Sequence, residues 1–234
     1  MKFNMGAILK AAITTAVAAS LLSACGGGGG GSPAASIQSF PFQAGYKALI
    51  ANGFSKPFTI SGSCLGGGVK TAAAAATAAT FGGAAALSSA SSLTLSFTNC
   101  TPAPTAQTSI SYFDRNYVPL GFISDGVFGV YLTPPTIPTV VSVGQTGAIG
   151  TENLYTDSTK ATSSGTQVLS FIVQADTSST AIINLATKSY NAAAMLTETE
   201  QDLYRIDAGG TLTPISTDLQ YTNGSTTHLV LTYY

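Results

Sequence analysis

The chain has 234 residues, enough for one domain or two small ones, and it carries nine Lys and Arg against ten Asp and Glu. Charged residues make up only 8% of it and form no basic cluster, which excludes a nucleic-acid-binding protein, because such a protein must neutralise phosphates. Hydrophobic residues make up 45%, which excludes a disordered chain.

The first 24 residues are arranged like a secretory signal peptide. Lys2 and Lys10 precede an apolar run, AAITTAVAASLL, after which small residues follow. The run is shorter than the about 20 apolar residues that a transmembrane helix needs. Residues 22–25, LSAC, then resemble the lipobox of bacterial lipoproteins. The resemblance implies cleavage before Cys25 and attachment of a diacylglycerol to its thiol, so that the protein's first partner is a membrane.

Residues 25–36 combine this cysteine with the segment GGGGGGSPAAS. Glycine adds no side chain to a core and loses the most backbone entropy on ordering, so the run predicts a flexible tether spanning roughly 17 to 20 Å. In lipoproteins, an aspartate after the cysteine typically marks retention in the inner membrane. Gly26 stands there instead, so the resemblance implies an outer-membrane location.

Residues 37–234 show the period-two alternation of half-buried strands. It is clearest in SLTLSF (92–97), QVLSFIVQA (167–175) and HLVLTYY (228–234), with turn signals such as DAGG and TNGS between such runs. We therefore predict an all-β domain, an antiparallel sandwich or a barrel-like meander. Three prolines in TPPTIPT (133–139) leave open two β halves, 37–133 and 139–234.

The alanine-rich segment 71–92 is the main competitor for helix. Its threonines, its two adjacent glycines and its lack of an amphipathic pattern favour a loop with at most a short helix. Cys64 and Cys100 flank this segment. They are the cysteines left after Cys25, and in an exported chain such a pair favours a disulfide.

The sequence contains few residues that could form a histidine-based catalytic site, a metal site or a nucleotide-binding loop. His228 is the chain's one histidine, and no G-x-S-x-G motif supplies a serine nucleophile, so we expect it to face solvent. In GSCLGGGVKT (62–71), Val69 separates glycine from Lys70, which excludes a P-loop. We expect no cofactor.

The segment TETEQD (197–202) is the densest group of acidic residues in the chain. In a strand, Glu198, Glu200 and Asp202 share one face. We expect a solvated outer face of the sheet. Two alternatives stay open, a weak cation site for Ca²⁺ and a carboxylate pair of the kind that glycosidases use.

Two tyrosine-containing turns could bind a sugar by stacking and by hydrogen bonds. The same polar side chains are also ordinary turn chemistry, and the chain has no tryptophan. The speculative ligand residues are Tyr112, Asp114, Asn116, Tyr117, Tyr155 and Asp157.

The sequence thus predicts an outer-membrane lipoprotein with a non-enzymatic structural or envelope-interaction role, with an envelope protein or a carbohydrate as partner. The alternatives are a binding module for a small, apolar or carbohydrate ligand and, less favoured, a glycosidase-like hydrolase.

Overall fold

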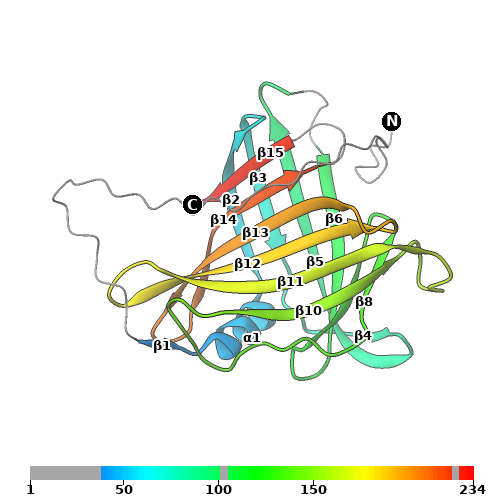
Figure 1. Cartoon of the computed structure of the whole chain (residues 1–234), viewed down its shortest axis with the longest axis horizontal. Coiled ribbons are helices and arrows are strands. Elements are labelled where there is room, and N and C mark those ends of the chain that lie inside the picture. The colour runs from blue at the N-terminus through cyan, green and yellow to red at the C-terminus, as the bar shows by residue number, and fades with distance from the viewer. Residues whose placement is uncertain (1–37, 101–104, 223–226) are drawn as a thin grey trace.

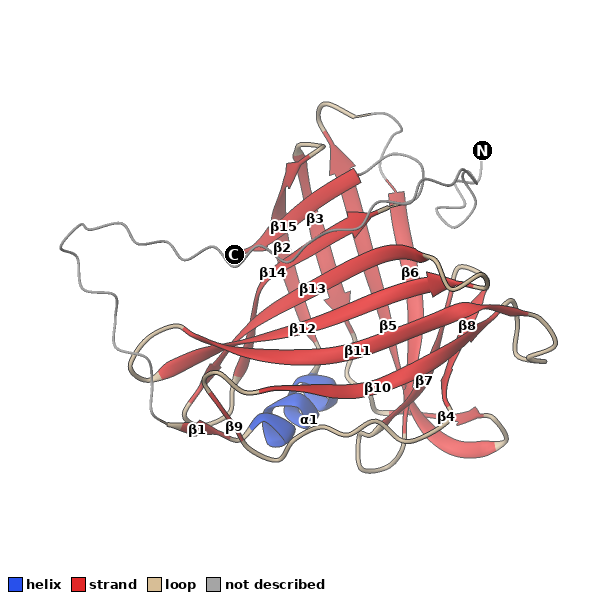
Figure 2. Ribbon diagram, viewed as in Figure 1, coloured by secondary structure: helices blue, strands red, loops and turns tan. Residues whose placement is uncertain are grey.

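The computed structural model describes residues 38–100, 105–222 and 227–234. They form one antiparallel barrel with a short helix at one end (Figures 1 and 2). The first elements are β1 (Ser39–Phe40), α1 (Phe42–Asn52), β2 (Phe54–Gly62), β3 (Gly66–Ala72), β4 (Thr77–Phe81), β5 (Ala84–Phe97), β6 (Thr105–Phe113), β7 (Pro119–Ser124) and β8 (Val127–Tyr131). They are followed by β9 (Val141–Ser142), β10 (Thr146–Tyr155), β11 (Ser163–Ala175), β12 (Thr180–Asn191), β13 (Leu196–Asp207), β14 (Leu212–Tyr221) and β15 (Thr227–Tyr233).

The barrel closes because β3 has a partner on each side. It pairs with β2 and also with β5, so that twelve strands form a ring. β4 pairs with β5 and adds a strand outside this ring, while β1 pairs with β9 in a separate two-stranded ribbon. The predicted all-β antiparallel fold is confirmed, and it takes the form of a barrel.

The predicted strands at 92–97 and 167–175 are confirmed as parts of β5 and β11, and the one at 228–234 is confirmed up to Tyr233, where β15 ends. The proline segment 133–139 does not divide the sheet. β8 before it and β10 after it are hydrogen-bonded neighbours, from Glu152 opposite Tyr131 to Tyr155 opposite Phe128. The ranges 37–133 and 139–234 therefore contribute strands to the same ring.

The expectation of a loop at 71–92 was wrong. The segment contains the end of β3, all of β4 and the first half of β5. Gly82 and Gly83 adopt φ angles of +58° and +84° and make the turn between β4 and β5. Pairing along a hairpin therefore outweighs the helical propensity of alanine, which is a weak preference that tertiary contacts override.

Helix α1 was not foreseen from the sequence. Phe42, Tyr46 and Leu49 recur at helical spacing and pack into the barrel core, and Gly53 ends the helix with a φ of +66°. Gly45 lies against the β13–β14 turn, where a Cβ would come within 2.0 Å of the Gly210 carbonyl oxygen.

Within the described residues, no helix is long and apolar enough to cross a membrane.

Two apolar clusters fill parts of the barrel. The first joins Phe42 of α1 to inward-facing residues of β11, β12 and β13, among them Phe171, Ile183 and Ile206. Helix α1 lies at one end of the barrel (Figure 2), and this cluster packs its apolar side chains against the strands there. The second, which we call the apolar wall, consists of Phe58, Ile60, Leu95, Leu219, Leu229 and Leu231.

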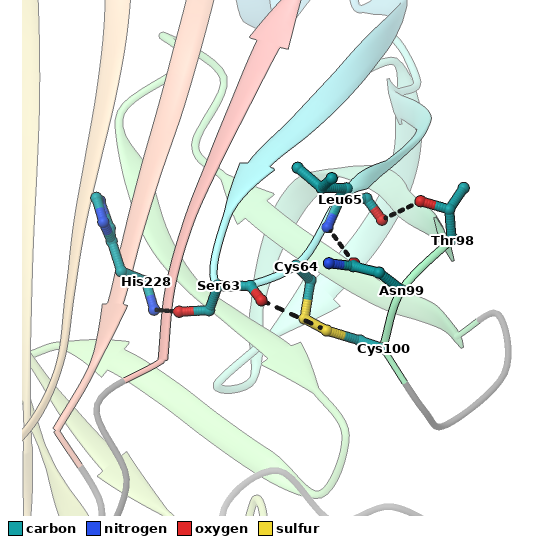
Figure 3. The surroundings of a disulfide bond; sticks show 7 residues. All are labelled: Ser63, Cys64, Leu65, Thr98, Asn99, Cys100 and His228. Atoms are coloured by element: carbon teal, nitrogen blue, oxygen red, sulfur yellow. Dashed lines mark hydrogen bonds between the residues drawn. A yellow bond between two sulfur atoms is a disulfide. The ribbon is translucent and has the colours of Figure 1, made fainter.

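The predicted disulfide between Cys64 and Cys100 is confirmed (Figure 3). It joins the β2–β3 turn to the residues after β5, at the end of the barrel opposite α1, because β2 starts directly after α1 and ends near Cys64. The Leu65 amide donates to Asn99 Oδ1 at 2.6 Å, and the His228 amide donates to Ser63 Oγ at 3.0 Å. The bond therefore holds the closing strands β3 and β5 together at this end.

The double variant Cys64→Ser, Cys100→Ser tests this contribution. A cross-link over 36 residues lowers the entropy of the unfolded chain, so we expect its loss to reduce the free energy of unfolding by about 4 kcal/mol. Urea denaturation of the oxidised parent and of the variant measures the difference. The reduced parent should match the variant. Equal stability of the variant and the oxidised parent would contradict the prediction.

Candidate functional site

The acidic side chains of β13 point into the barrel, so the expected solvated outer face was wrong. Glu198, Glu200 and Asp202 share a strand face with Tyr204 and Ile206, both of which are buried in the core next to α1. Gln201 and Arg205 alternate with these residues along β13 and point outward. There Arg205 Nε lies 2.7 Å from Asp176 Oδ2. The inward orientation of the acids could be predicted from the alternation along the strand, because Ile206 must face the core and every second residue before it faces the same way.

All three glutamates of the chain face the interior. Glu152 on β10 joins Glu198 and Glu200, and it was missed in the sequence. Aspartates behave differently, since Asp114, Asp157 and others sit in turns while Asp202 alone among those described faces inward. The inward orientation of Glu152 could have been inferred from its place between Gly150 and Leu154 in a strand with alternating faces.

An ion pair crosses the interior. Lys70 Nζ on β3 lies 3.4 Å from Asp202 Oδ1 on β13, although β2, β15 and β14 separate these strands in the ring. The Thr217 hydroxyl donates to the same Asp202 oxygen, and Thr217 Oγ1 lies 2.9 Å from the Tyr233 hydroxyl. We call Lys70, Glu200, Asp202, Thr217 and Tyr233 the charged cluster.

The interior is not completely filled at the level of this cluster. The side chains of Lys70 and Asp202 keep 24% and 23% of their surface accessible although both point inward. Burial alone would lower the pKa of Lys70, but Asp202 and also Glu200 hold it well above its usual range. Lys70 is therefore permanently charged, in a space that still admits water.

The two glutamates of β13 hold their protons more tightly than exposed ones. Burial, the neighbouring Asp202 and Glu198 together raise the pKa of Glu200 to about 8, against the opposing effect of Lys70. Burial also raises the pKa of Glu198. At neutral pH the interior thus contains carboxyl groups that can exchange a proton.

A continuous row of polar side chains runs across six neighbouring strands on the inner face. Each member is the cross-strand partner of the next, and Gln167 Nε2 donates to Ser189 Oγ at 3.0 Å. The row runs obliquely from the end of β8, near α1, to the end of β14. We call it the interior polar row, and it consists of Tyr131, Glu152, Gln167, Ser189, Glu198 and Tyr221.

Glu152 is the most buried member of this row, with 6% of its surface exposed. No residue in the described part of the chain forms a hydrogen bond or an ion pair with its carboxyl group. Burial raises its pKa to about 7. Burial, and then the nearby Glu152, raise the pKa values of Tyr46 and Tyr131.

The weak cation site proposed for β13 has no support from its geometry. Across the described residues, no group of three or more His, Cys, Asp or Glu side chains is arranged to hold a metal ion.

His228 lies on the outer face as expected, with Nε2 2.9 Å from Asp218 Oδ1 and nearly half of the side chain exposed.

The tyrosine-containing turns lie on the outside of the barrel. Asp114 Oδ1 accepts the amides of Asn116 and Val118, and Asp157 Oδ1 accepts the amide and hydroxyl of Thr159. Both carboxylates thus satisfy their own turns. Tyr117 belongs to the first of these turns, with a φ of +62°.

Phe81 at the tip of the β4–β5 hairpin stacks on Tyr112 at 4.6 Å and on Phe128 at 5.1 Å, and Tyr155 packs against the same cluster. Tyr112, Phe128 and the loop 158–160 line a shallow groove of about 560 Å³. The structure therefore brings Tyr112, Tyr155 and the Asp157 turn to one side of the barrel.

No protein-family model, no curated protein and no solved structure matches this chain. The geometry of the barrel interior is thus the basis on which a function can be assigned.

The variant Glu152→Gln tests the interior carboxyl. A folded-state pKa of about 7 against an ordinary value of 4.5 means that the native protein keeps a proton which the unfolded chain releases between these values. The parent should therefore lose stability relative to Glu152→Gln as pH rises from 4.5 to 7, by about 3 kcal/mol.

Denaturation at pH 4.5 and pH 8 measures this difference. The control Asp125→Asn, which removes an exposed carboxyl in the β7–β8 turn, is measured at the same two pH values. A difference between parent and Glu152→Gln that does not change with pH would show that the carboxyl is not buried.

Proposed function

We propose that the chain is a lipid-anchored, non-enzymatic binding protein that holds a small ligand inside its barrel. The observation that carries this proposal is the set of ionisable side chains directed into an interior that still admits water. Turning carboxyl groups inward costs free energy, and apolar residues of similar volume would stabilise the barrel at least as well. A purely structural barrel gains nothing from such an interior.

The distribution of side chains supports the same function. At one end, the core cluster packs α1 against the strands. Beyond that cluster lie the interior polar row and the charged cluster, and the apolar wall includes residues of β14 and β15, the strands that carry Thr217 and Tyr233. A concave, mainly apolar surface with a few convergent polar groups is typical of small-molecule sites.

The non-enzymatic assignment is supported by the placement of the reactive side chains. His228 is on the outer face, and Cys64 and Cys100 are joined in a disulfide.

The envelope location rests on the N-terminal segment alone, since Cys25 and the tether lie outside the described residues. The order of basic residues, apolar run, small residues and cysteine supports a diacylated Cys25 in the outer membrane. A tether of this length would leave the barrel close to the lipid surface, which suits a protein that captures a ligand there.

Because the chain has no tryptophan, one introduced tryptophan is a unique fluorescent reporter. Tyr221→Trp places it on the inner face beside Glu198, and Tyr190→Trp places it on the outer face of β12. We expect at least one of decanoate, maltose and hexyltrimethylammonium to shift the emission of the Tyr221→Trp protein saturably, because bound ligand displaces water near the indole.

The emission of the Tyr190→Trp control should stay constant in the same titrations. No shift in the inner variant with any of the three probes, or equal shifts in both variants, would contradict a binding site inside the barrel.

Metabolic labelling with palmitate tests the anchor. The Cys25→Ser variant should lose the label and keep its signal peptide, because the thiol that accepts the lipid is gone. The Cys64→Ser, Cys100→Ser variant should keep the label. Labelling that persists in Cys25→Ser would disprove the lipoprotein assignment.

A further inference from the structure

The charges inside the barrel do not balance. Four carboxyl groups face inward on β10 and β13, and Lys70 is a base that meets them. Lys56 is the cross-strand partner of Lys70 and shares its inward face, at the α1 end of the barrel, where it also lines a groove with Asn52 and Gly53. Four inward carboxyl groups are therefore met by two inward lysines. In the described part of the structure, the interior therefore carries more negative than positive groups.

Glu152 provides an observation that is independent of the acidic strand. It comes from β10, three strands away from β13 in the ring, and yet it lies in the same interior polar row as Glu198. The residue as a whole is 6% exposed, and its carboxyl group forms no hydrogen bond or ion pair with any described residue. A buried carboxyl without a partner is costly, and a cationic ligand would supply the missing partner.

Aromatic and apolar surfaces surround these carboxyls. Tyr131 and Tyr221 stand at the two ends of the interior polar row, and Tyr233 belongs to the charged cluster. Tyrosine rings attract cations through their faces, and the effect is strongest where water is excluded. The apolar wall, in which Phe58 and Leu229 are already packed, gives this side of the interior a hydrocarbon lining.

From these observations we infer that the ligand is a small organic cation with an apolar body, its charged group held against Glu152, Glu198 and Glu200. The inference rests on the proposed function of the barrel as a binding protein. An inorganic metal ion fits less well, because within the described residues no three side chains of the required kinds converge. An anion fits less well because Lys70 is already paired with Asp202.

Binding of a cation would expel protons from the interior. Glu200 is faced by Glu198, Asp202, Lys70, Tyr204, Tyr221 and Tyr233, and Glu152 is faced by Tyr46 and Tyr131. With pKa values of about 8 and about 7, both glutamates are partly protonated near neutral pH. A permanent cation favours their ionised forms, so its affinity should rise with pH.

Three probes with the same hexyl chain separate charge from hydrophobicity: hexyltrimethylammonium, hexanol and heptanoate. Calorimetry on the full barrel domain should show that the cation binds at least about tenfold tighter than either other probe at pH 8. Its affinity should rise at least about fivefold from pH 6 to pH 9, with protons released to the buffer. The cation's own charge does not titrate, so this dependence reports the protein.

Glu200→Gln and Glu152→Gln should each weaken cation binding at least about fivefold and flatten its pH dependence. Asp218→Asn, which removes a carboxylate from the outer face, should leave both unchanged. Equal binding of the three probes, or cation binding that survives both glutamate variants, would overturn the inference while leaving a binding barrel intact. No binding of any of the three, together with silent Tyr221→Trp titrations, would overturn the proposed function as well.

Discussion

Closure of the sheet between β3 and β5 is the constraint on which the rest of the structure depends. Once β3 pairs with β5, every strand of the ring has two neighbours and one face of each strand must point inward. The glycines of β3 allow this pairing, because a Cβ on Gly68 would come within 1.9 Å of the Thr94 carbonyl oxygen and would also meet the Phe58 ring. The disulfide then holds the same two strands at their ends.

Closure leaves the barrel with an interior that apolar side chains only partly fill. The α1 cluster and the apolar wall account for the aromatic and leucine residues, and ionisable groups remain between them. Lys70 and Asp202 reduce the cost of this arrangement by crossing the interior as an ion pair, and Thr217 supports Asp202 with a hydrogen bond. Among the residues that the structure describes, no comparable partner meets Glu152, and burial raises its pKa. A fold that accepts such costs in its interior is better explained by binding than by stability alone.

The sequence was informative where one signal dominated. Alternation in β5, β11 and β15 identified strands and the residues they bury, and the two cysteines of the folded part identified the disulfide. It misled at 71–92, where alanine content hides a hairpin whose pairing is decided by distant strands. It also missed α1, whose apolar face makes sense only against the barrel end that it covers.

The candidate site shows the same limit more sharply. Acidic residues on a strand usually face water, and only the phase set by Tyr204 and Ile206 reveals that those of β13 face inward. Glu152 meets Glu198 in one row because β11 and β12 align them, and nothing local to either residue encodes that register. Lys70 reaches Asp202 across the ring, a contact between residues 132 positions apart in the chain.

The most direct test of this account is a carboxyl ¹³C titration of protein labelled at glutamate. The chain contains three glutamates, all of which face the interior, so three side-chain resonances report on the site without interference. We expect that none titrates as an exposed glutamate does, with one midpoint about 7 for Glu152, one about 8 for Glu200 and a raised value for Glu198. Three midpoints near the ordinary value of 4.5 would show that these carboxyls face water, and would contradict a binding site built from them.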